Sequence, residues 1–311
     1  MAAAKQIPLT CTGHTRPVVD LAFSSFTYSG DFFLISACKD SIPILRRGNT
    51  GDWVGSFQGH KGAVWSTRLS SDATKSVTGS ADFTAKVWNN LTGQATITVP
   101  HSHVVRCVDM SPDGRYVLTG GYEKKIRLFD LQTDASRGPI RQLEQCDNII
   151  KTALMDADNG LVFAGDGKML RVWDLRTSAQ VSFRQFDHDI TSLRFSNDRG
   201  MIICTSGKQV FFYNALTSAL VKSFTTTIET ASASLHPDGS RLVVGGISDL
   251  WVRVYDWATG QEQEVYKGHH GPIHVVSYSP DGELYATGSE DGTVRLWQTS
   301  PGKAYALWEQ Q

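Results

Sequence analysis

The sequence predicts an all-β protein folded as a ring of seven four-stranded sheets, and three observations support this. An apolar-aromatic pair closes successive units, at Val87-Trp88, Leu128-Phe129, Val172-Trp173, Phe212-Tyr213, Val254-Tyr255 and Leu296-Trp297, with aromatic spacings of 41, 44, 40, 42 and 42 residues. Short runs rich in Val, Ile, Thr and aromatic residues recur between turns, which is typical of strands. No segment sustains the 3.6-residue period of a helix. Repeats of about 40 to 45 residues with four strands each are typical of β-propellers, so we predict seven blades.

The first element in the chain is a lone strand. Gln6–Thr12 has the pattern of a fourth strand that no first three precede. A ring of sheets must close, because an open end would expose a strand edge to other chains. We therefore expect this segment to pair with the third strand of the last unit, Thr293–Trp297.

The units that follow share one internal order. Counting back from Trp88, the first unit ends at Ile42–Leu45, with Arg46 in the aromatic position. Several units contain a turn in which Pro presets φ and Gly permits positive φ, at Ser111-Pro-Asp-Gly114, His236-Pro-Asp-Gly239 and Ser279-Pro-Asp-Gly282. Fourth strands are expected at Trp53–Phe57, Ala95–Val99 and Val221–Phe224. Residues 1–311 would form one domain, with Lys303–Gln311 as a short C-terminal tail.

A set of four polar and aromatic residues repeats at fixed offsets. His60, Thr78, Asp82 and Trp88 in the second unit are matched in the seventh unit by His269, Thr287, Asp291 and Trp297. The first unit keeps His14, Ser36 and Asp40. The third unit keeps His101, Thr119 and Phe129 but has Glu123 in place of the aspartate. The fourth, fifth and sixth units lack the full set.

We interpret these tetrads as structural and predict no catalytic residue. A catalytic triad occurs once per active site, whereas this constellation recurs in successive blades. A carboxylate, an imidazole, a hydroxyl and an indole can satisfy one another inside a blade, and an unpaired buried polar group costs about 1–3 kcal/mol. No nucleophile elbow accompanies the set. We expect Asp82→Ala and Asp291→Ala to lower the melting temperature, and Asp166→Ala to matter less.

Loops at one rim of the ring are candidates for partner binding, because loops vary freely while strands are used in the blades. The fifth position after the tetrad histidine aligns across the seven units as Val19, Trp65, Arg106, Lys151, Thr191, Ala231 and His274. The residues before the turn acids add Lys39, Tyr122, Ser248 and Glu290. Trp, Arg and Tyr are frequent interface anchors, so we predict a partner-binding face here. The alternative for Trp65 is a cap on the core.

Several other classes of function are disfavoured. With 30 Lys+Arg and 31 Asp+Glu, the net charge of -1 provides no long-range attraction for nucleic acid. Five widely spaced cysteines indicate neither disulfides nor zinc, and His269, His270 and His274 could not converge on one ion from an extended strand. No phosphate-binding glycine motif occurs, so no cofactor or metal is expected. Neither a signal peptide nor a membrane span is apparent, and we expect a monomer in the cytosol and nucleus.

The repeats resemble the WD-repeat family. Within it the chain resembles, essentially from end to end, the family of serine-threonine kinase receptor-associated proteins, also called unr-interacting proteins. The segments that carry this resemblance are Gly13–Phe23, Leu34–Asp40, Thr50–Trp65, Ala81–Trp88 and Gly268–Gln298.

The resemblance implies a non-catalytic scaffold that binds other proteins. Family partners are subunits of the survival-of-motor-neuron (SMN) complex, including Gemins, in spliceosomal snRNP assembly and mRNA splicing. Others are the RNA-binding protein unr in translational control and receptor kinases in transforming growth factor-β signalling. The alternative is a propeller like subunit i of eukaryotic translation initiation factor 3. Residues Asp82–Trp88 and Lys303–Trp308 favour the first family over this alternative.

Overall fold

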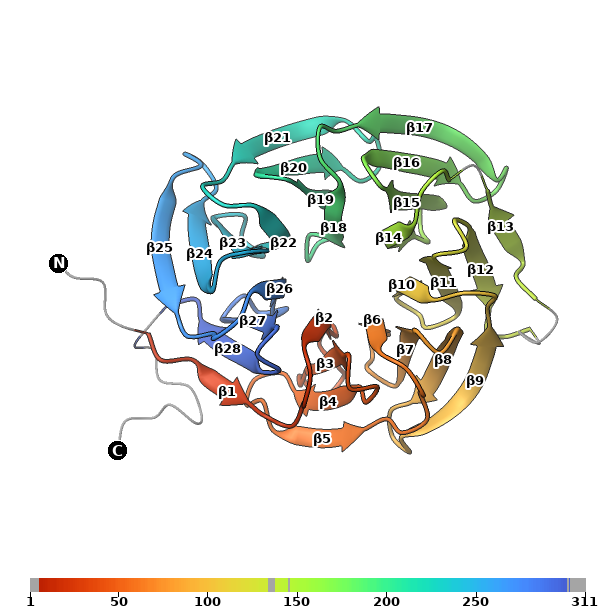
Figure 1. Cartoon of the computed structure of the whole chain (residues 1–311), viewed down its shortest axis with the longest axis horizontal. Coiled ribbons are helices and arrows are strands. Elements are labelled where there is room, and N and C mark those ends of the chain that lie inside the picture. Colours follow the sequence, from red (N-terminus) through yellow and green to blue (C-terminus); the bar gives the residue numbers. More distant parts are fainter. Residues whose placement is uncertain (1–5, 134–137, 145, 301, 303–311) are drawn as a thin grey trace.

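The computed structural model describes residues 6–133, 138–144, 146–300 and 302. In these ranges, strands form seven four-stranded antiparallel sheets arranged as blades around a central channel (Figure 1). The predicted seven-bladed β-propeller is confirmed. No helix in these ranges has the length and apolar character needed to cross a membrane.

The strands of each blade are ordered from the channel outward. The innermost strands are β2 (Val18–Phe23), β6 (Val64–Leu69), β10 (Val105–Met110), β14 (Ile150–Asp156), β18 (Ile190–Phe195), β22 (Thr230–Leu235) and β26 (Ile273–Tyr278). The second strands are β3 (Phe33–Cys38), β7 (Lys75–Ser80), β11 (Tyr116–Gly121), β15 (Leu161–Asp166), β19 (Met201–Ser206), β23 (Arg241–Gly246) and β27 (Leu284–Ser289). The third strands are β4 (Ile44–Arg47), β8 (Thr84–Asn89), β12 (Ile126–Asp130), β16 (Met169–Asp174), β20 (Gln209–Asn214), β24 (Trp251–Asp256) and β28 (Val294–Gln298). The outermost strands are β1 (Leu9–Cys11), β5 (Trp53–Ser56), β9 (Gln94–Pro100), β13 (Arg141–Leu143), β17 (Ala179–Gln185), β21 (Leu220–Thr225) and β25 (Glu262–Lys267).

The N-terminal strand closes the ring as predicted. β1 is antiparallel to β28 and is the outermost strand of the last blade, with Leu9 opposite Leu296 and Cys11 opposite Val294. The paired segment is shorter than the expected Gln6–Thr12, although the Gln6 amide donates to the Gln298 carbonyl at 2.6 Å. The predicted tail, Lys303–Gln311, lies outside the described residues.

The core is a circle of hydrophobic clusters, one at each interface between neighbouring blades. At the interface of the last and first blades, Cys11, Val294 and Leu296 pack with Val18 and Leu34. The inner strands of each blade therefore turn apolar residues toward the adjacent blades on both faces, which explains why they read as apolar runs rather than as strict alternation. The stability of each blade depends on its two neighbours.

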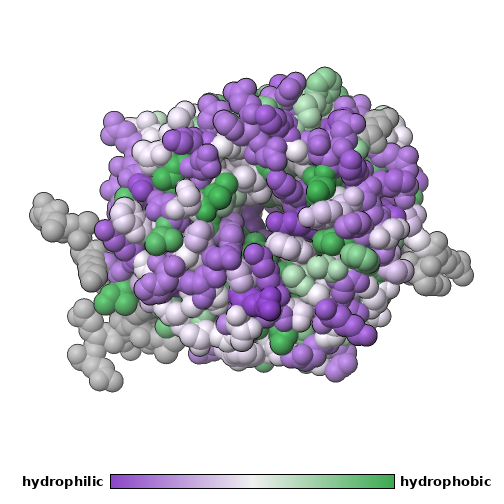
Figure 2. Space-filling view, viewed as in Figure 1, coloured by the Kyte–Doolittle hydropathy of each residue, from purple (hydrophilic) through white to green (hydrophobic). Residues whose placement is uncertain are grey.

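The view down the channel shows a mostly hydrophilic surface with small separate hydrophobic patches around a central opening (Figure 2). The inner strands all start at one end of this channel and finish at the other. The starts of these strands define one face of the ring, which we call the entry face. The ends of the same strands and the loops after them define the opposite face, which we call the exit face.

Candidate partner-binding face

Three blades contain a hydrogen-bonded tetrad or its remnant. In the second blade, His60 Nδ1 lies 2.7 Å from Asp82 Oδ2, and His60 Nε2 lies 2.7 Å from Thr78 Oγ1, which also accepts from Trp88 Nε1 at 2.8 Å. The last blade repeats these bonds among His269, Thr287, Asp291 and Trp297 at 2.9, 2.7 and 2.9 Å. In the first blade, His14 bridges Asp40 at 2.9 Å and Ser36 at 2.7 Å. Each set joins the loop that enters the blade to the turn between its second and third strands.

The tetrad carboxylates are held in their ionised form. Burial alone would raise the pKa of Asp82, but hydrogen bonds from His60, Thr84 and the Lys61 backbone hold it well below its usual range. The pKa of Asp40 falls to about 2 because the hydrogen bond from His14 and backbone donors outweigh its burial. For His269 the balance is reversed, since burial lowers its pKa more than the Asp291 carboxylate raises it. This direction favours a neutral imidazole at His269, which serves both a carboxylate and a hydroxyl.

The third blade does not form the tetrad. The Glu123 carboxylate is one methylene further from the backbone than an aspartate, and its Oε1 lies 3.8 Å from His101 Nδ1. Arg127 intervenes, with its guanidinium 2.5 Å from Glu123 and 3.1 Å from His101 Nδ1. Among the described residues, His101 Nε2 and Thr119 Oγ1 have no hydrogen-bond partner, and Phe129 has no indole N–H to donate to Thr119. Burial, followed by the Arg127 charge, lowers the pKa of His101 to about 4.

In the first blade an arginine replaces the aromatic residue of the tetrad, and in the fourth blade an arginine pairs with a buried aspartate. Arg46, buried at the aromatic position of the first blade, donates to the Gly51 and Thr12 carbonyls and lies 5.2 Å from the Trp53 ring centroid. In the fourth blade, Asp166 ends β15 and is followed by a two-residue turn, so it does not occupy the turn-acid position. The fully buried Asp166 accepts from Arg171 Nε at 2.8 Å and from two backbone amides. Because of these bonds, we now expect Asp166→Ala to cost as much as loss of a tetrad aspartate.

The seven residues predicted to lie around the channel mouth do lie there. Val19, Trp65, Arg106, Lys151, Thr191, Ala231 and His274 all line one hollow of about 370 Å³ at the entry face. Each of them occupies a break in the pairing register between the first and second strands of its blade. A β-bulge re-aims a side chain out of the normal alternation. The bulges therefore explain why this position points at the channel mouth in every blade.

Aromatic and charged groups on this face contact one another. The Arg106 guanidinium lies 4.1 Å from the Trp65 ring centroid, and Lys39 Nζ lies 5.6 Å from it. Trp65 is only half-buried and belongs to none of the hydrophobic clusters of the described residues, so it does not act simply as a core cap. Cation–π contacts of this kind hold an indole in a fixed orientation.

Acidic residues balance part of the charge at the rim of the same hollow. His274 Nε2 lies 2.6 Å from Glu290, and Lys39 Nζ lies 3.7 Å from the same carboxylate. Lys151 pairs with Asp189 at 2.9 Å. These ion pairs are partly exposed and therefore weak, so a partner could exchange them for its own charges.

Sequence reasoning missed an aromatic stack in the loops of the second and third blades on the entry face. Phe83 contacts His103, with ring centroids 5.4 Å apart, and His103 stacks on Tyr122 at 4.9 Å with an interplanar angle of 5°. Phe83 and Tyr122 are 43% and 42% exposed, which is high for rings of this size. Of the three, only Tyr122 had been predicted for this face. The missed signal is Phe83 itself, which stands where the seventh blade has Gly292.

Phe83 adopts a backbone conformation that suits glycine. Its φ is 65°, close to the 77° of Gly292 at the equivalent turn position. A bulky residue with positive φ is strained, and such strain is often kept at functional sites. Ser41 and Lys124 have positive φ at the same turn position, so the conformation belongs to the turn, and it is the exposed ring that distinguishes Phe83.

One group of potential metal ligands has a simpler explanation. His14, Cys38 and Asp40 each place a ligand atom within 4.8 Å of the others. Both nitrogens of His14 already have partners in the first-blade set. The Cys38 thiol donates to the Arg16 carbonyl at 2.9 Å, and burial raises its pKa to about 12. A neutral thiol, and an imidazole whose two nitrogens are both hydrogen-bonded, are poor metal ligands, so we assign this group to the structure of the blade.

The fold and the repeated tetrads define a class of protein, the WD-repeat propellers. A family model described as WD domain, G-beta repeat matches residues 51–89, 94–130 and 260–298. Each match begins with the outermost strand of one blade (β5, β9 or β25) and continues through the three inner strands of the next, which is the second, third or seventh blade.

Comparison with individual proteins is more specific. The chain is 48% identical over 307 residues to the serine-threonine kinase receptor-associated protein of Gallus gallus, covering 99% of this chain and 87% of that protein. The protein of the same name from Dictyostelium discoideum is 45% identical over 293 residues, covering 94% and 98%. Eukaryotic translation initiation factor 3 subunit I of Bombyx mori is only 27% identical over 316 residues. The chain belongs to the family of serine-threonine kinase receptor-associated proteins.

Proposed function

We propose that this chain is a non-catalytic scaffold that binds a protein partner through its entry face. The observation that carries the proposal is the ring of bulge residues around one hollow, with Trp65 fixed by Arg106 and Lys39. Half-buried aromatic and arginine side chains near the centre of a concave surface are typical of interface anchors. The exposed stack of Phe83, His103 and Tyr122 extends this surface over the second and third blades.

Binding rather than catalysis is favoured by how the reactive groups are used. The imidazole–carboxylate pairs resemble catalytic dyads, yet their hydroxyl partners, Thr78 and Thr287, are fully buried and also accept from tryptophan indoles. A hydroxyl in that position has no access to a substrate. The tetrads therefore support the blades, which in turn hold the bulge residues in place.

The family resemblance supports specific partners. We propose that the scaffold serves the SMN complex, contacting Gemin subunits during spliceosomal snRNP assembly in the cytosol and nucleus. An unr-like RNA-binding protein and receptor kinases are further proposed partners, and the name of the relatives itself refers to association with serine-threonine kinase receptors. A role in initiation factor 3 has less support, because those relatives are 26% and 27% identical.

Affinity capture from native extract tests this proposal. We expect the wild-type chain to capture Gemin and Sm proteins, and Trp65→Ala/Arg106→Ala to lose most of them. The matched control is Phe26→Ala/Tyr28→Ala, which removes two exposed aromatic rings from the loop after β2 on the exit face. Equal capture by a folded Trp65→Ala/Arg106→Ala variant would refute the entry face as the binding site. Capture of other initiation factor subunits in place of Gemins would refute the proposed complex.

A further inference from the structure

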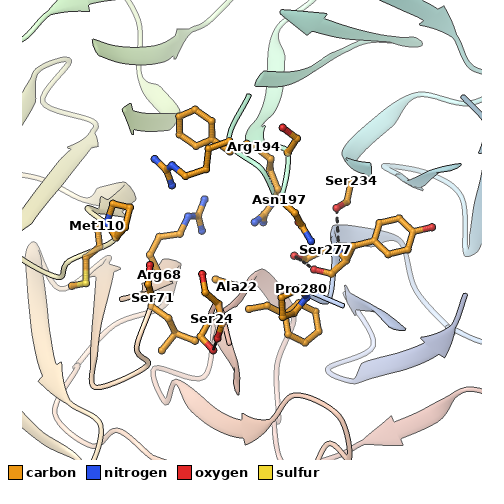
Figure 3. Close-up of a pocket in the computed structure, with 18 of the residues that line it drawn as sticks. Ala22, Ser24, Arg68, Ser71, Met110, Arg194, Asn197, Ser234, Ser277 and Pro280 are labelled. Atoms are coloured by element: carbon orange, nitrogen blue, oxygen red, sulfur yellow. Dashed lines mark hydrogen bonds between the residues drawn. The ribbon is translucent and has the colours of Figure 1, made fainter. Parts of the chain in front are cut away.

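A second hollow lies at the exit face of the channel. Its volume is about 430 Å³, within the range of about 300–1,000 Å³ that is usual for small-molecule sites. Figure 3 shows that Arg68 and Arg194 extend toward each other into this space, with Asn197 beside them and Ser24, Ser71 and Ser277 around the rim. Nothing in the proposed scaffold function uses this hollow.

The hollow has an excess of positive charge. Three arginines, Arg68, Arg194 and Arg199, line it, and Asp109 is the one carboxylate among the lining residues. Burial raises the pKa of Asp109 more than Arg68 and Arg199 lower it. Even in its ionised form, this one carboxylate offsets the charge of only one of the three arginines. Its Oδ1 is 3.6 Å from Arg68 Nε, and its Oδ2 is occupied by the Met155 amide at 2.7 Å.

Asp20, above the hollow, neutralises only one of these arginines. Its Oδ2 accepts from Arg68 at 2.7 Å and its Oδ1 from Arg194 at 2.6 Å. Three further donors, from Ser66 and from the Leu21 and Thr67 backbones, fill its remaining positions. A carboxylate with five donors has no capacity left for Arg199, so the cluster keeps a net positive charge.

The arginines of the hollow have donor capacity that the described residues do not use fully. Among these residues, the buried Arg194 Nε has no hydrogen-bond partner. Arg199 donates from Nη2 to the Met155 carbonyl at 2.8 Å and lies 4.2 Å from the Phe195 ring centroid, which fixes the position of its guanidinium. Ser71 lies beside Arg68 at the edge of the hollow (Figure 3). Fixed guanidinium and hydroxyl donors suit an oxyanion, because charge-assisted hydrogen bonds are the strongest that proteins form.

The wall of the hollow limits the size of the ligand. The loop between β2 and β3 places Phe26 at its mouth, where the ring packs edge-on against Phe32 at 5.7 Å between centroids. Phe23, Phe195 and Pro280 complete an apolar boundary. A ligand here would be compact, with its charges directed at the arginines.

We propose that the exit-face hollow binds a small polyanion, of the phosphate-ester or polycarboxylate class. The alternative, that the arginines serve only as internal struts, accounts for Arg68 and Arg194 through Asp20. It accounts for the position of Arg199 through the Met155 carbonyl, but among the described residues it leaves the charge of Arg199 without a paired carboxylate and Arg194 Nε without a partner.

Isothermal titration calorimetry at constant ionic strength tests the proposal, with pyrophosphate for the phosphate class and citrate for the polycarboxylate class. We expect wild type to bind at least one of the two probes and Arg199→Met to bind it at least about tenfold more weakly, since one charge-assisted contact is lost. Arg184→Met is the matched control, because Arg184 also donates to a backbone carbonyl and lies 5.7 Å from an aromatic ring, but on outer strand β17. The control should bind like wild type.

A second variant keeps the proposal testable if Arg199→Met does not fold. Ser71→Glu places a carboxylate in the hollow without removing an arginine and should also abolish binding, with the melting temperature of the free protein little changed. Binding of pyrophosphate alone, or of citrate alone, identifies the class. The proposal is overturned if wild type binds neither probe at millimolar concentration. It is also overturned if Arg199→Met and Ser71→Glu both bind a probe as tightly as wild type does. Partner capture through the entry face is independent of either result.

Discussion

At the scale of single residues, the tetrads, which recur at a fixed spacing, stabilise the blades that contain them. Asp82 accepts from His60 and from the Lys61 and Thr84 backbones, so one carboxylate connects the entering loop to the turn. The His60 side chain is fully buried. Loss of the carboxylate would leave Nδ1 of this buried imidazole without its carboxylate partner, and an unsatisfied polar group is costly inside a protein.

We expect Asp82→Ala and Asp291→Ala each to lower stability by about 1–3 kcal/mol, measured as a fall in melting temperature. Asp166→Ala should cause a similar loss through Arg171 and the two amides that it would leave unpaired. Asp158→Ala is the control, since this exposed residue lies in the turn after β14 and should change stability by less than about 0.5 kcal/mol. A tetrad variant with the same melting temperature as the Asp158→Ala control would contradict the structural role of the tetrad.

Phe83 offers a test that separates binding from stability. In Phe83→Gly, relief of the positive φ is offset by the lost contact with His103 and by the greater freedom of the unfolded chain, so stability should change by less than about 1 kcal/mol. Partner capture should nevertheless fall several-fold. Ser178→Gly, with a φ of 56° in the turn before β17, is the matched control and should leave capture unchanged. Full capture by Phe83→Gly would remove the aromatic stack from the binding face.

At the scale of elements, the closing strand determines whether the ring is complete. β1 contributes Cys11 to the cluster between the last and first blades and covers the edge of β28. Without β1, that edge would present unpaired backbone groups, which tend to recruit other chains.

A chain that begins at Gly13 should lose about 3 kcal/mol or more of stability, because Cys11 and Leu9 no longer cover Leu296. It should also self-associate, which size-exclusion chromatography would detect. Ile7→Ser alters an exposed residue outside β1 and should have neither effect. A truncated chain that stays monomeric with an unchanged melting temperature would show that β1 is dispensable.

These elements also show how far sequence reasoning reached. The tetrads of the second and last blades follow from fixed offsets within one hairpin and its entering loop, which is why the spacing sufficed to find them. The third blade departed because one methylene moves the Glu123 carboxylate away from His101, a difference that spacing does not contain. The bulges depend on strand register, and the Phe83–His103–Tyr122 stack joins three separate loops. The repeat predicted the position of the bulge residues but not the break in register, and the aromatic stack leaves no periodic signal in the sequence.

At the scale of the whole molecule, the ring is held together by neighbour contacts and also by bonds across the channel. The hydrophobic clusters join only adjacent blades. Arg194 of the fifth blade reaches Asp20 of the first blade, 174 residues away in sequence. Asn197 of the fifth blade likewise donates to the Ser279 carbonyl in the seventh blade at 3.0 Å. The fifth blade thus contacts the two blades that flank the closure of the ring.

The Asp20–Arg194 bond should therefore couple distant blades energetically. Although burial opposes it, the charges of Arg68 and Arg194 lower the pKa of Asp20, so the carboxylate is ionised and its removal would leave two guanidiniums in the channel without their counter-charge. We expect Asp20→Ala to cost about 3–5 kcal/mol and Arg194→Met less, because Asp20 retains Arg68 in the second variant. In a double-mutant cycle, the two losses should fall short of additivity by about 1–3 kcal/mol. The control cycle uses Lys151 and Asp189, an exposed pair 2.9 Å apart that should couple by less than about 1 kcal/mol. Additive losses for Asp20 and Arg194 would mean that the channel bond joins the two blades in geometry but not in stability.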